Sequence, residues 1–217
     1  MRRSPDGRHG FTLMELLIVI AMIAILIGIA YPSFISILEK ARKTQAANEE
    51  QQIVTAVNGY YTDYGKYPLV TADATISGST SPSNADLFYT LRGVALGANA
   101  PVNGIPAANP RATVYIQPPI SKTGTKGGVT STTGIWYDPF GSPYNVMIDG
   151  SYDNNLTNPY TSDPSPPGGA TLYLGVIVWS FGKNGALGGG AAAPGFSATE
   201  NGTANKFTNS GDVISWQ

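Results

Sequence analysis

The feature that most constrains this chain is an apolar run near its N-terminus, from Phe11 to Ala30. Thr12 and Glu15 are the only polar side chains within the run. A helix of about twenty residues rises about 30 Å, which is the thickness of the hydrocarbon core of a bilayer. The run therefore predicts a membrane-spanning helix that carries one carboxylate in its first turn.

The carboxylate of Glu15 is the unusual part of this helix. A charged side chain at the centre of a bilayer costs about 2.5–3.5 kcal/mol on insertion scales, and such residues usually have a function. The alternative is that Glu15 lies at the membrane edge, where the N-terminus of the helix stabilises a negative charge. The specific pattern of residues around Glu15 favours a function.

That pattern is Gly10-Phe11-Thr12-Leu13-Met14-Glu15-Leu16. It resembles the cleavage and methylation motif of type IV pilins and of the pseudopilins of type II secretion. The resemblance implies that a prepilin peptidase cuts between Gly10 and Phe11 and that the new amine of Phe11 is N-methylated. It also implies that Glu15 guides assembly into a homo-oligomeric helical filament by neutralising the Phe11 amine of a neighbouring subunit.

The flanks of the motif agree with this resemblance. Residues 1–10 form a short leader with three arginines, and basic residues beside a membrane segment predict a cytoplasmic N-terminus. A secretory signal would place its cleavage site after an apolar region of about 7–15 residues. Here the expected cleavage site precedes a longer apolar run. The helix of residues 11–32 is therefore expected to remain in the mature protein and to serve in the membrane and in assembly.

Apolar residues continue at helical spacing after the membrane segment. They are Ile35, Leu38, Ile53, Val54, Val57, Tyr60, Tyr61 and Tyr64. We predict one long helix from Phe11 to about Tyr61, with its amphipathic part in residues 33–65. Pro32 predicts a kink near residues 28–32, because proline cannot donate the backbone hydrogen bond of a helix. Alternatively, Pro32 only marks the exit from the membrane.

The remaining residues, 66–217, are predicted to form a β-rich head domain. The chain contains 26 glycines and 16 prolines, and such a composition favours strands, turns and loops. The predicted fold class is α+β, a long N-terminal helix packed on a small antiparallel β-sheet, as in pilins. Residues at about 69–133 are predicted to be a loop insertion with a short helix at Asn84–Arg92 and a strand at Ala112–Gln117. A buried strand is expected at 172–180.

A second diagnostic stretch runs from Ile135 to Ile148 and contains Asp138-Pro139-Phe140-Gly141-Ser142-Pro143-Tyr144. It is a turn between two apolar runs. It looks like a turn of the major pseudopilin of type II secretion, with Phe140 in place of tryptophan. Trp136, Tyr137 and Tyr144 are interpreted as core aromatics of a hairpin.

The C-terminal part also resembles major pseudopilins, which end with a strand, a loop and an aspartate that bind calcium. Carried over to this chain, the resemblance implies side-chain ligands from Asn184 and Asp212 and backbone carbonyl ligands from Phe181 and Val213. Calcium takes six to eight oxygen ligands, and carboxylates raise its affinity. Asn184 stands where the family has an aspartate, so a simple turn that fixes the last strand is the alternative.

The composition excludes several kinds of activity. The chain has no cysteine, and its single histidine, His9, lies in the leader. The mature protein therefore lacks a disulfide, a zinc thiolate site and a Ser-His-Asp triad, which argues against an enzyme. The net charge of −1 provides no basic surface for phosphate groups, so nucleic acid is not an expected partner.

Three functions compete on this basis. The leading one is a type II secretion pseudopilin that works with an inner-membrane assembly platform and with minor pseudopilins. Such a subunit would be single-pass, with a cytoplasmic N-terminus and a periplasmic head. The alternative is a type IV pilin that forms a surface fibre for adhesion or motility. A third hypothesis is a membrane-tethered enzyme or carbohydrate-binding module that uses Trp136, Trp179 and Trp216 to stack on sugars.

Overall fold

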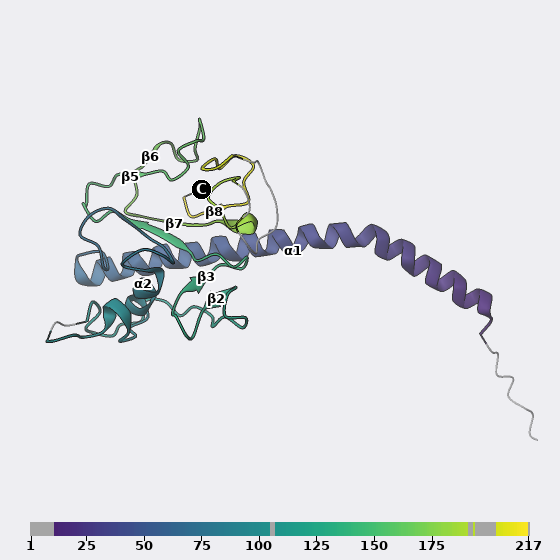
Figure 1. Ribbon diagram of the computed structural model, residues 1–217, viewed down its shortest axis with the longest axis horizontal. Coiled ribbons are helices and arrows are strands. Elements are labelled where there is room, and N and C mark those ends of the chain that lie inside the picture. The colour runs from purple at the N-terminus through teal and green to yellow at the C-terminus, as the bar shows by residue number, and fades with distance from the viewer. Residues whose placement is uncertain (1–10, 105–106, 191–192, 194–202, 217) are drawn as a thin grey trace, which may run out of the picture. The chain divides into compact units, whose positions relative to one another are not determined.

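The computed structural model describes residues 11–104, 107–190, 193 and 203–216 (Figure 1). The chain divides into two compact units, residues 1–41 and 42–217. The leader, residues 1–10, lies outside the described residues. The elements are α1 (Leu13–Tyr64), β1 (Ala74–Ile76), α2 (Asn84–Leu91), η1 (Gly97–Asn99), β2 (Gly128–Val129), β3 (Trp136–Tyr137), β4 (Asn145–Ile148), β5 (Leu156–Thr157), β6 (Thr171–Leu172), β7 (Val176–Ser180), η2 (Gly182–Asn184) and β8 (Val213–Ile214).

Helix α1 has 52 residues, which confirms the prediction of one long N-terminal helix. It ends at Gly65, whose φ of +65° is left-handed and whose N–H bonds the Tyr61 carbonyl at 2.8 Å. A glycine after the last turn adopts this conformation without the steric cost that a Cβ would bring. The end of the helix is therefore set by the Gly65 that follows the tyrosine-rich last turn.

The segments Leu13–Ile29 and Phe34–Tyr64 of α1 are bent by 41° at the break between them. A bend at this place was predicted from Pro32. Among the described residues no single helix has the length and apolar composition needed to cross a membrane, whereas this bent pair, taken together, could.

The head contains a four-stranded antiparallel sheet in the order β1-β4-β7-β8. Its register pairs Val146 with Val178 and Trp179 with Ile214. Two short two-stranded sheets, β2-β3 and β5-β6, accompany it. This architecture confirms the α+β fold class.

The larger hydrophobic core lies between the C-terminal half of α1, the sheet and α2 (Figure 1). Side chains alternate across a strand, so Val176 and Val178 of β7 share this core while Ile177 and Trp179 face the other side of the sheet. The residues that α1 contributes are Ile53, Ala56, Val57 and Tyr60. The amphipathic spacing in the sequence therefore located Ile53, Val57 and Tyr60 of the buried face. The other predicted positions include three that are exposed, Ile35, Leu38 and Tyr61.

The second core covers the opposite face of the sheet. It brings Ile177, Trp179 and Ile214 together with residues of β5 and β6. Trp216, near the C-terminus, packs against it with its ring centroid 6.4 Å from that of Trp179. The C-terminal segment is thus held both by the β7-β8 pairing and by aromatic contacts.

Residues 69–133 contain more structure than a plain loop. They supply the edge strand β1, and they supply α2, whose Leu87, Phe88 and Leu91 are buried in the larger core. A reciprocal capping box of Ser83 and Asp86 starts α2, as expected for the predicted helix at Asn84–Arg92.

The strand predicted at Ala112–Gln117 is wrong, because no strand lies in that range. The Tyr115 amide instead bonds the Leu91 carbonyl at the end of α2, at 2.8 Å. Ala112 has a left-handed φ of +49°, which does not fit a strand. Apolar residues in this range pack against helices and do not pair with a neighbouring strand.

One further expectation needs correction. The strand predicted at 172–180 is divided, because β6 ends at Leu172 and β7 begins at Val176, with Tyr173 between them 73% exposed. The turn at Asp138–Pro143 does join two antiparallel segments, since Tyr137 and Pro143 form an antiparallel bridge and the Tyr144 N–H donates to the Trp136 carbonyl at 3.1 Å. The longer ladders of β3 and β4 are formed with β2 and with β1 and β7. Trp136 and Tyr144 are nevertheless fully buried core aromatics, as predicted, whereas Tyr137 is only partly buried.

One buried amide joins three of these elements and gives a test of the fold. Asn84, the first residue of α2, accepts from the Trp136 amide at 2.8 Å and donates to the Tyr144 carbonyl at 2.7 Å. We expect Asn84→Ala to lower the free energy of unfolding by about 2–3 kcal/mol, because buried backbone groups lose their partners. Urea unfolding followed by tryptophan fluorescence measures this loss. Asn58→Ala, on an exposed face of α1, should change stability by less than about 0.5 kcal/mol; equal losses in both variants would contradict the assignment.

Candidate functional site

The predicted assembly residue, Glu15, forms a capping box with Thr12 at the start of α1. The Glu15 carboxylate accepts from the Thr12 backbone N–H and from the Thr12 hydroxyl, both at 2.8 Å. In return the Glu15 N–H donates to Thr12 Oγ1 at 3.2 Å. This is the S/T-x-x-E arrangement that satisfies two free N–H groups at a helix N-terminus. Glu15 therefore has an intramolecular role that the sequence analysis did not identify.

This box fixes the carboxylate close to the predicted cleavage site. Phe11 immediately precedes Thr12 and is 77% exposed, whereas Gly10 lies outside the described residues. Glu15 is also exposed, so nothing within the described chain covers its outer side. A new amine on Phe11 would begin one helical turn from a carboxylate whose position is already set.

The surface around this box is apolar over many residues. Large hydrophobic side chains are exposed from Leu13, at 87%, through to Leu38, at 40%. Soluble monomers rarely expose contiguous apolar surface on this scale, and such surface marks a site of interaction with lipid or protein. The N-terminal unit therefore presents a membrane- or partner-binding face in addition to its capping box.

The residues predicted to bind calcium do lie together around the turn after β7. Asn184 is buried, and its amide donates to the Gly188 carbonyl at 2.9 Å while its Oδ1 accepts from the Ala186 N–H at 3.0 Å. Asp212 Oδ2 accepts from the Tyr160 hydroxyl at 2.8 Å and from the Gly188 N–H at 2.7 Å. Both side chains thus bind the same stretch of loop.

These contacts decide how well the loop fits a calcium ion. The Asn184 oxygen and one Asp212 oxygen already accept hydrogen bonds from protein groups, so in this arrangement the pair does not offer the oxygen cluster that calcium requires. The backbone at Gly182 also lies close to the backbone at Gly211, because a Cβ at Gly182 would clash with the Gly211 carbonyl oxygen. The geometry is that of a hydrogen-bonded turn, and calcium binding by Asn184, Asp212, Phe181 and Val213 stays a prediction.

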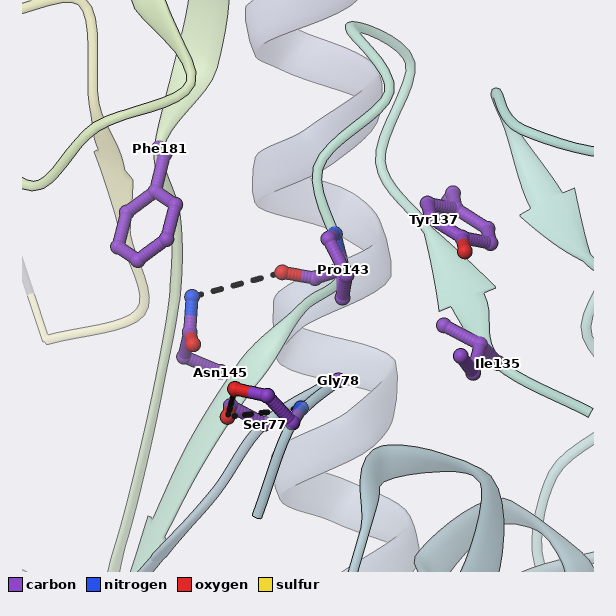
Figure 2. A pocket seen from close by; sticks show the side chains of 8 residues that line it. Ser77, Gly78, Ile135, Tyr137, Pro143, Asn145 and Phe181 are labelled. Atoms are coloured by element: carbon purple, nitrogen blue, oxygen red, sulfur yellow. Dashed lines mark hydrogen bonds between the residues drawn. The ribbon is translucent and has the colours of Figure 1, made fainter. Parts of the chain in front are cut away.

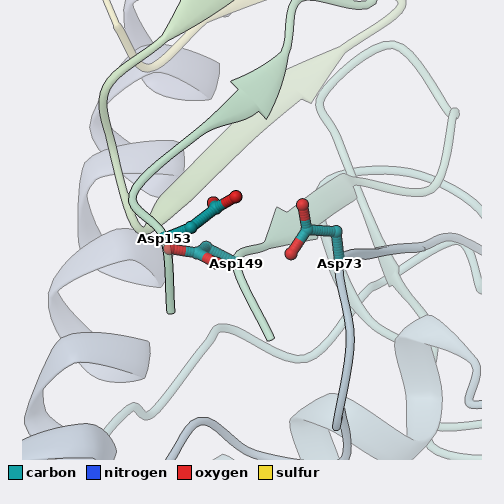
Figure 3. A group of neighbouring side chains, drawn as sticks. All are labelled: Asp73, Asp149 and Asp153. Atoms are coloured by element: carbon teal, nitrogen blue, oxygen red, sulfur yellow. The ribbon is translucent and has the colours of Figure 1, made fainter. Parts of the chain in front are cut away.

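A different group of carboxylates was not foreseen from the sequence. Asp73, Asp149 and Asp153 each place an oxygen within 4.8 Å of the others (Figure 3). Asp149 is buried and accepts from the backbone N–H groups of Tyr152, at 2.6 Å, and Asn154, at 2.7 Å. Hydrogen bonds from Ser151 lower the pKa of Asp73. Exposed acidic groups are common without an ion, so we assign no metal here.

One signal in the sequence could have found this group. Oxygen-bearing side chains occur at alternate positions from Asp149 to Asn155, and such spacing is a feature of loops that bind calcium. The contribution of Asp73 could not have been found in this way, because the pairing of β1 with β4 is what brings it to the loop.

A hollow of about 220 Å³ lies between the β3-β4 turn and the residues after β1 (Figure 2). Tyr137, Pro143, Asn145 and Phe181 are among its lining residues, and the Asn145 amide donates to the Pro143 carbonyl at 3.4 Å. The residues that line it include no carboxylate, histidine or amine. The hydroxyls that line the hollow, those of Ser77, Ser79 and Tyr137, therefore have no carboxylate, imidazole or amine among the lining residues to act as a base.

The tryptophans do not provide the sugar-binding surface of the third hypothesis. Trp136 and Trp179 are buried, and Trp216 packs against the second core. Stacking on a sugar requires an exposed aromatic face, which Trp136 and Trp179 do not present, whereas Trp216 is partly exposed.

Comparison with known proteins finds its matches in the same N-terminal segment that carries the capping box and the exposed apolar surface. A family model described as the prokaryotic N-terminal methylation motif matches residues 6–31. The chain is 38% identical over 74 residues to the fimbrial protein EcpC of Eikenella corrodens, covering 34% of this chain and 48% of that protein. In its N-terminal part the chain is therefore similar to type IV pilins and pseudopilins.

Other relatives include both branches of this pilin family. The chain is 36% identical over 66 residues to the type IV major pilin protein PilA of Myxococcus xanthus, covering 30% of each chain. It is 33% identical over 66 residues to the type II secretion system core protein G of Escherichia coli (strain K12), covering 30% of this chain and 46% of that protein. The chain spans about half or less of these relatives. No solved structure matches it.

The relatives are structural pilin subunits and not enzymes. The methylation motif also implies an N-terminal, membrane-anchoring apolar segment. The second statement agrees with the exposed apolar surface of the N-terminal unit.

The hydrogen bonds around Asp212 lead to a direct test of how the C-terminal loop is held. We expect Tyr160→Phe to lower the free energy of unfolding by about 1.5–3 kcal/mol, because a buried hydrogen bond to a charged group is lost. Thermal or urea unfolding of the full chain measures the change, and Tyr173→Phe, at an exposed tyrosine, is the matched control. If added calcium raised the stability of Tyr160→Phe to the wild-type level, a metal rather than the hydroxyl would be the main support of Asp212.

Proposed function

We propose that this chain is a structural subunit of a pilus-like filament. A prepilin peptidase removes residues 1–10 by cutting between Gly10 and Phe11, and the new Phe11 amine is N-methylated. Residues 11–32 hold the subunit in the membrane before assembly and form the centre of the filament afterwards. The observation that supports this proposal most strongly is an exposed apolar helix that begins with the Thr12–Glu15 capping box.

The exposed apolar surface provides the physical reason to polymerise. Once a subunit leaves lipid, the side chains from Leu13 to Leu38 must be covered by other apolar groups, because their exposure to water costs about 25 cal/mol per Å². Helices of identical subunits are the cover that a homo-oligomeric filament supplies. Assembly thereby replaces lipid contacts with contacts between copies.

Glu15 then controls the position of each new subunit. Its carboxylate, positioned by Thr12, would pair with the Phe11 amine of a neighbour in the apolar filament core. An unpaired charge there is costly, whereas the net gain from a buried pair is small. The pair therefore acts mainly by excluding subunits in the wrong register.

Within this class we favour a pseudopilin of type II secretion that helps to drive protein export. Its head would be periplasmic, and its partners would be the prepilin peptidase, an inner-membrane assembly platform and minor pseudopilins. Support comes from the turn at Asp138–Pro143, whose aspartate accepts three backbone N–H groups, and from the similarity to core protein G. The closing of the C-terminal segment by β8 pairing, without a disulfide, is compatible with this role.

The second candidate is a surface pilin for adhesion or motility, and the similarity to fimbrial and major pilin proteins favours it. Deletion of the gene separates the two. Loss of secreted enzymes with no change in surface fibres supports the pseudopilin, and loss of long fibres with normal secretion supports the pilin.

The processing step predicts the mass of the mature N-terminus. We expect the isolated protein to begin with N-methylated Phe11, because the apolar helix is retained and the cleavage site lies before it. Peptide mass spectrometry of protein from the native host measures this directly. A chain that begins at Met1, or one that is cut near Ala30, would contradict the proposal.

Substitution of Glu15 separates charge from helix capping. We expect Glu15→Val to insert and to be processed but to give few filaments. Glu15→Gln retains a side chain that can close the capping box and lacks the charge. It should therefore assemble as poorly as Glu15→Val if pairing with Phe11 is the function, and filament yield after shearing measures both. Wild-type yield from Glu15→Gln would mean that capping, not charge, is what assembly needs.

A further inference from the structure

Glu50 is a buried carboxylate of the head without a hydrogen-bond partner among the described residues. It lies on α1 three residues before Ile53 of the larger core, and its exposed fraction is 0%. Neither of its carboxylate oxygens has a hydrogen-bond partner within the part of the chain that the structure describes. Leaving an ionised group in such a place costs several kcal/mol unless it is paired, and the usual outcome is that it becomes neutral.

The neighbours of Glu50 are other buried carboxylates. Asp138 lies in the turn before β4, Asp212 precedes β8, and Glu49 is adjacent in α1. The side chains of Tyr144 and Tyr160 also face this group, and they carry no positive charge. The charged groups that act most strongly on Glu50 are therefore acidic and do not neutralise it.

The three neighbouring carboxylates differ from Glu50 because protein donors support them. Glu49 accepts from the Gln45 amide at 2.8 Å and from the Tyr144 hydroxyl at 2.6 Å. Asp138 accepts from the N–H groups of residues 140, 141 and 142 and from the Ser180 hydroxyl. Asp212 accepts from the Tyr160 hydroxyl. Glu50 differs from them because neither of its oxygens has a hydrogen-bond partner among the described residues. Burial outweighs the backbone of Ser180, which favours the ionised form of Glu50.

A proton is the neutralising group that this geometry favours. A divalent cation would need several oxygens converging on one point. Among the described residues, the only three carboxylates whose oxygens converge within 4.8 Å are Asp73, Asp149 and Asp153, and Glu50 is not one of them.

We propose that Glu50 is a neutral carboxylic acid in the folded head, and that its ionisation at higher pH weakens the packing of α1 against β7 and the C-terminal segment. This makes the stability of the head depend on pH through one residue of the helix that connects it to the N-terminal unit.

The direction of the effect follows from linkage. Burial raises the pKa of Glu50 well above its ordinary value of 4.5, and the negative charge of Asp138 raises it further. The folded state then keeps a proton that the unfolded state has released. The stability that protonated Glu50 contributes is fully present below pH 4.5 and is lost as the pH rises toward the folded pKa. In the pH range where only the folded state keeps this proton, the unfolding equilibrium constant rises about tenfold per pH unit.

One pH window isolates Glu50 from its neighbours. Burial raises the pKa of Asp138 to about 6, so its contribution ends close to that pH. Burial also raises the pKa of the hydroxyl groups of Tyr144 and Tyr160 well above 10, so they titrate only in strong base. Between about pH 7 and 8.5 neither Asp138 nor these tyrosines titrates, so a pH dependence of unfolding that disappears when Glu50 is replaced belongs to Glu50.

The test uses the full chain in detergent micelles, with EDTA, and follows urea unfolding by fluorescence of its three tryptophans, all of which lie in the head unit. We expect the wild-type unfolding constant to rise with pH across this window, by up to about tenfold per unit for as long as the pH is below the folded pKa of Glu50. Glu50→Gln should remove that rise and be the more stable protein at pH 8.5. Glu49→Gln, the matched control, should retain the rise, because it leaves Glu50 unchanged.

Several results would overturn the proposal. A flat wild-type profile, or a Glu50→Gln profile with the wild-type slope, would show that Glu50 is not protonated in the folded state. Loss of the slope when calcium replaces EDTA would show that a cation neutralises it instead. If Glu50→Gln does not fold, Glu50→Met takes its place. At pH 7.5 the infrared carbonyl band of a protonated carboxylic acid should be present in the wild type and absent from the folded variant.

Discussion

A single helix has to meet two different requirements along its length, and this constraint governs the rest of the structure. Beyond residue 42, α1 supplies core residues such as Ile53 and Val57, which are fully buried. Before residue 39 its large apolar side chains, such as Leu13 and Leu26, are exposed. The first part is an exposed apolar helix that can be covered by lipid or by another protein, and the second part contributes to the core of the head.

Because α1 occupies the centre of the head core, the remaining chain can be built from short strands and long connections. The strands have two to five residues, and the loops between them are held by buried polar side chains. Asn109 shows how this works. Its amide donates to the carbonyls of Thr90 and Thr113, and its Oδ1 accepts from the Tyr64 hydroxyl of α1 at 2.8 Å. Such contacts satisfy backbone groups that a sheet ladder would otherwise pair.

The same division explains how much of the fold could be predicted. Helix α1 was predictable because a continuous apolar run leads into apolar residues at helical spacing. The start of α2 is marked by a local signal, the capping box of Ser83 and Asp86. The strands were less accessible, since β2, β3, β5, β6 and β8 have only two residues each. A period of two cannot be recognised over two residues, and the interruption at Tyr173 depends on what lies beside it.

The candidate sites divide along the same line. Gly10, Phe11 and Glu15 could be read from the sequence because they act through a pattern of adjacent residues. The surroundings of Glu50 could not, since Asp138 and Asp212 are brought to it by the turn before β4 and by the β7-β8 pairing. The hydrogen bonds that Asn184 and Asp212 accept could not be predicted either. A resemblance in residue types does not show which side-chain oxygens already accept hydrogen bonds.

This difference has a physical origin in how the two parts of the chain are held. The N-terminal motif must be recognised by other molecules while the helix is exposed, so its determinants have to be contiguous and local. Groups inside the head are constrained only by their neighbours in space, and a carboxylate there can be supported by donors from three separate elements or by none. Asp138 and Glu50 are buried to the same extent, yet only Asp138 has four donors around it. Burial alone therefore does not decide whether an acid stays charged; the arrangement of donors does, and that arrangement is a property of the fold.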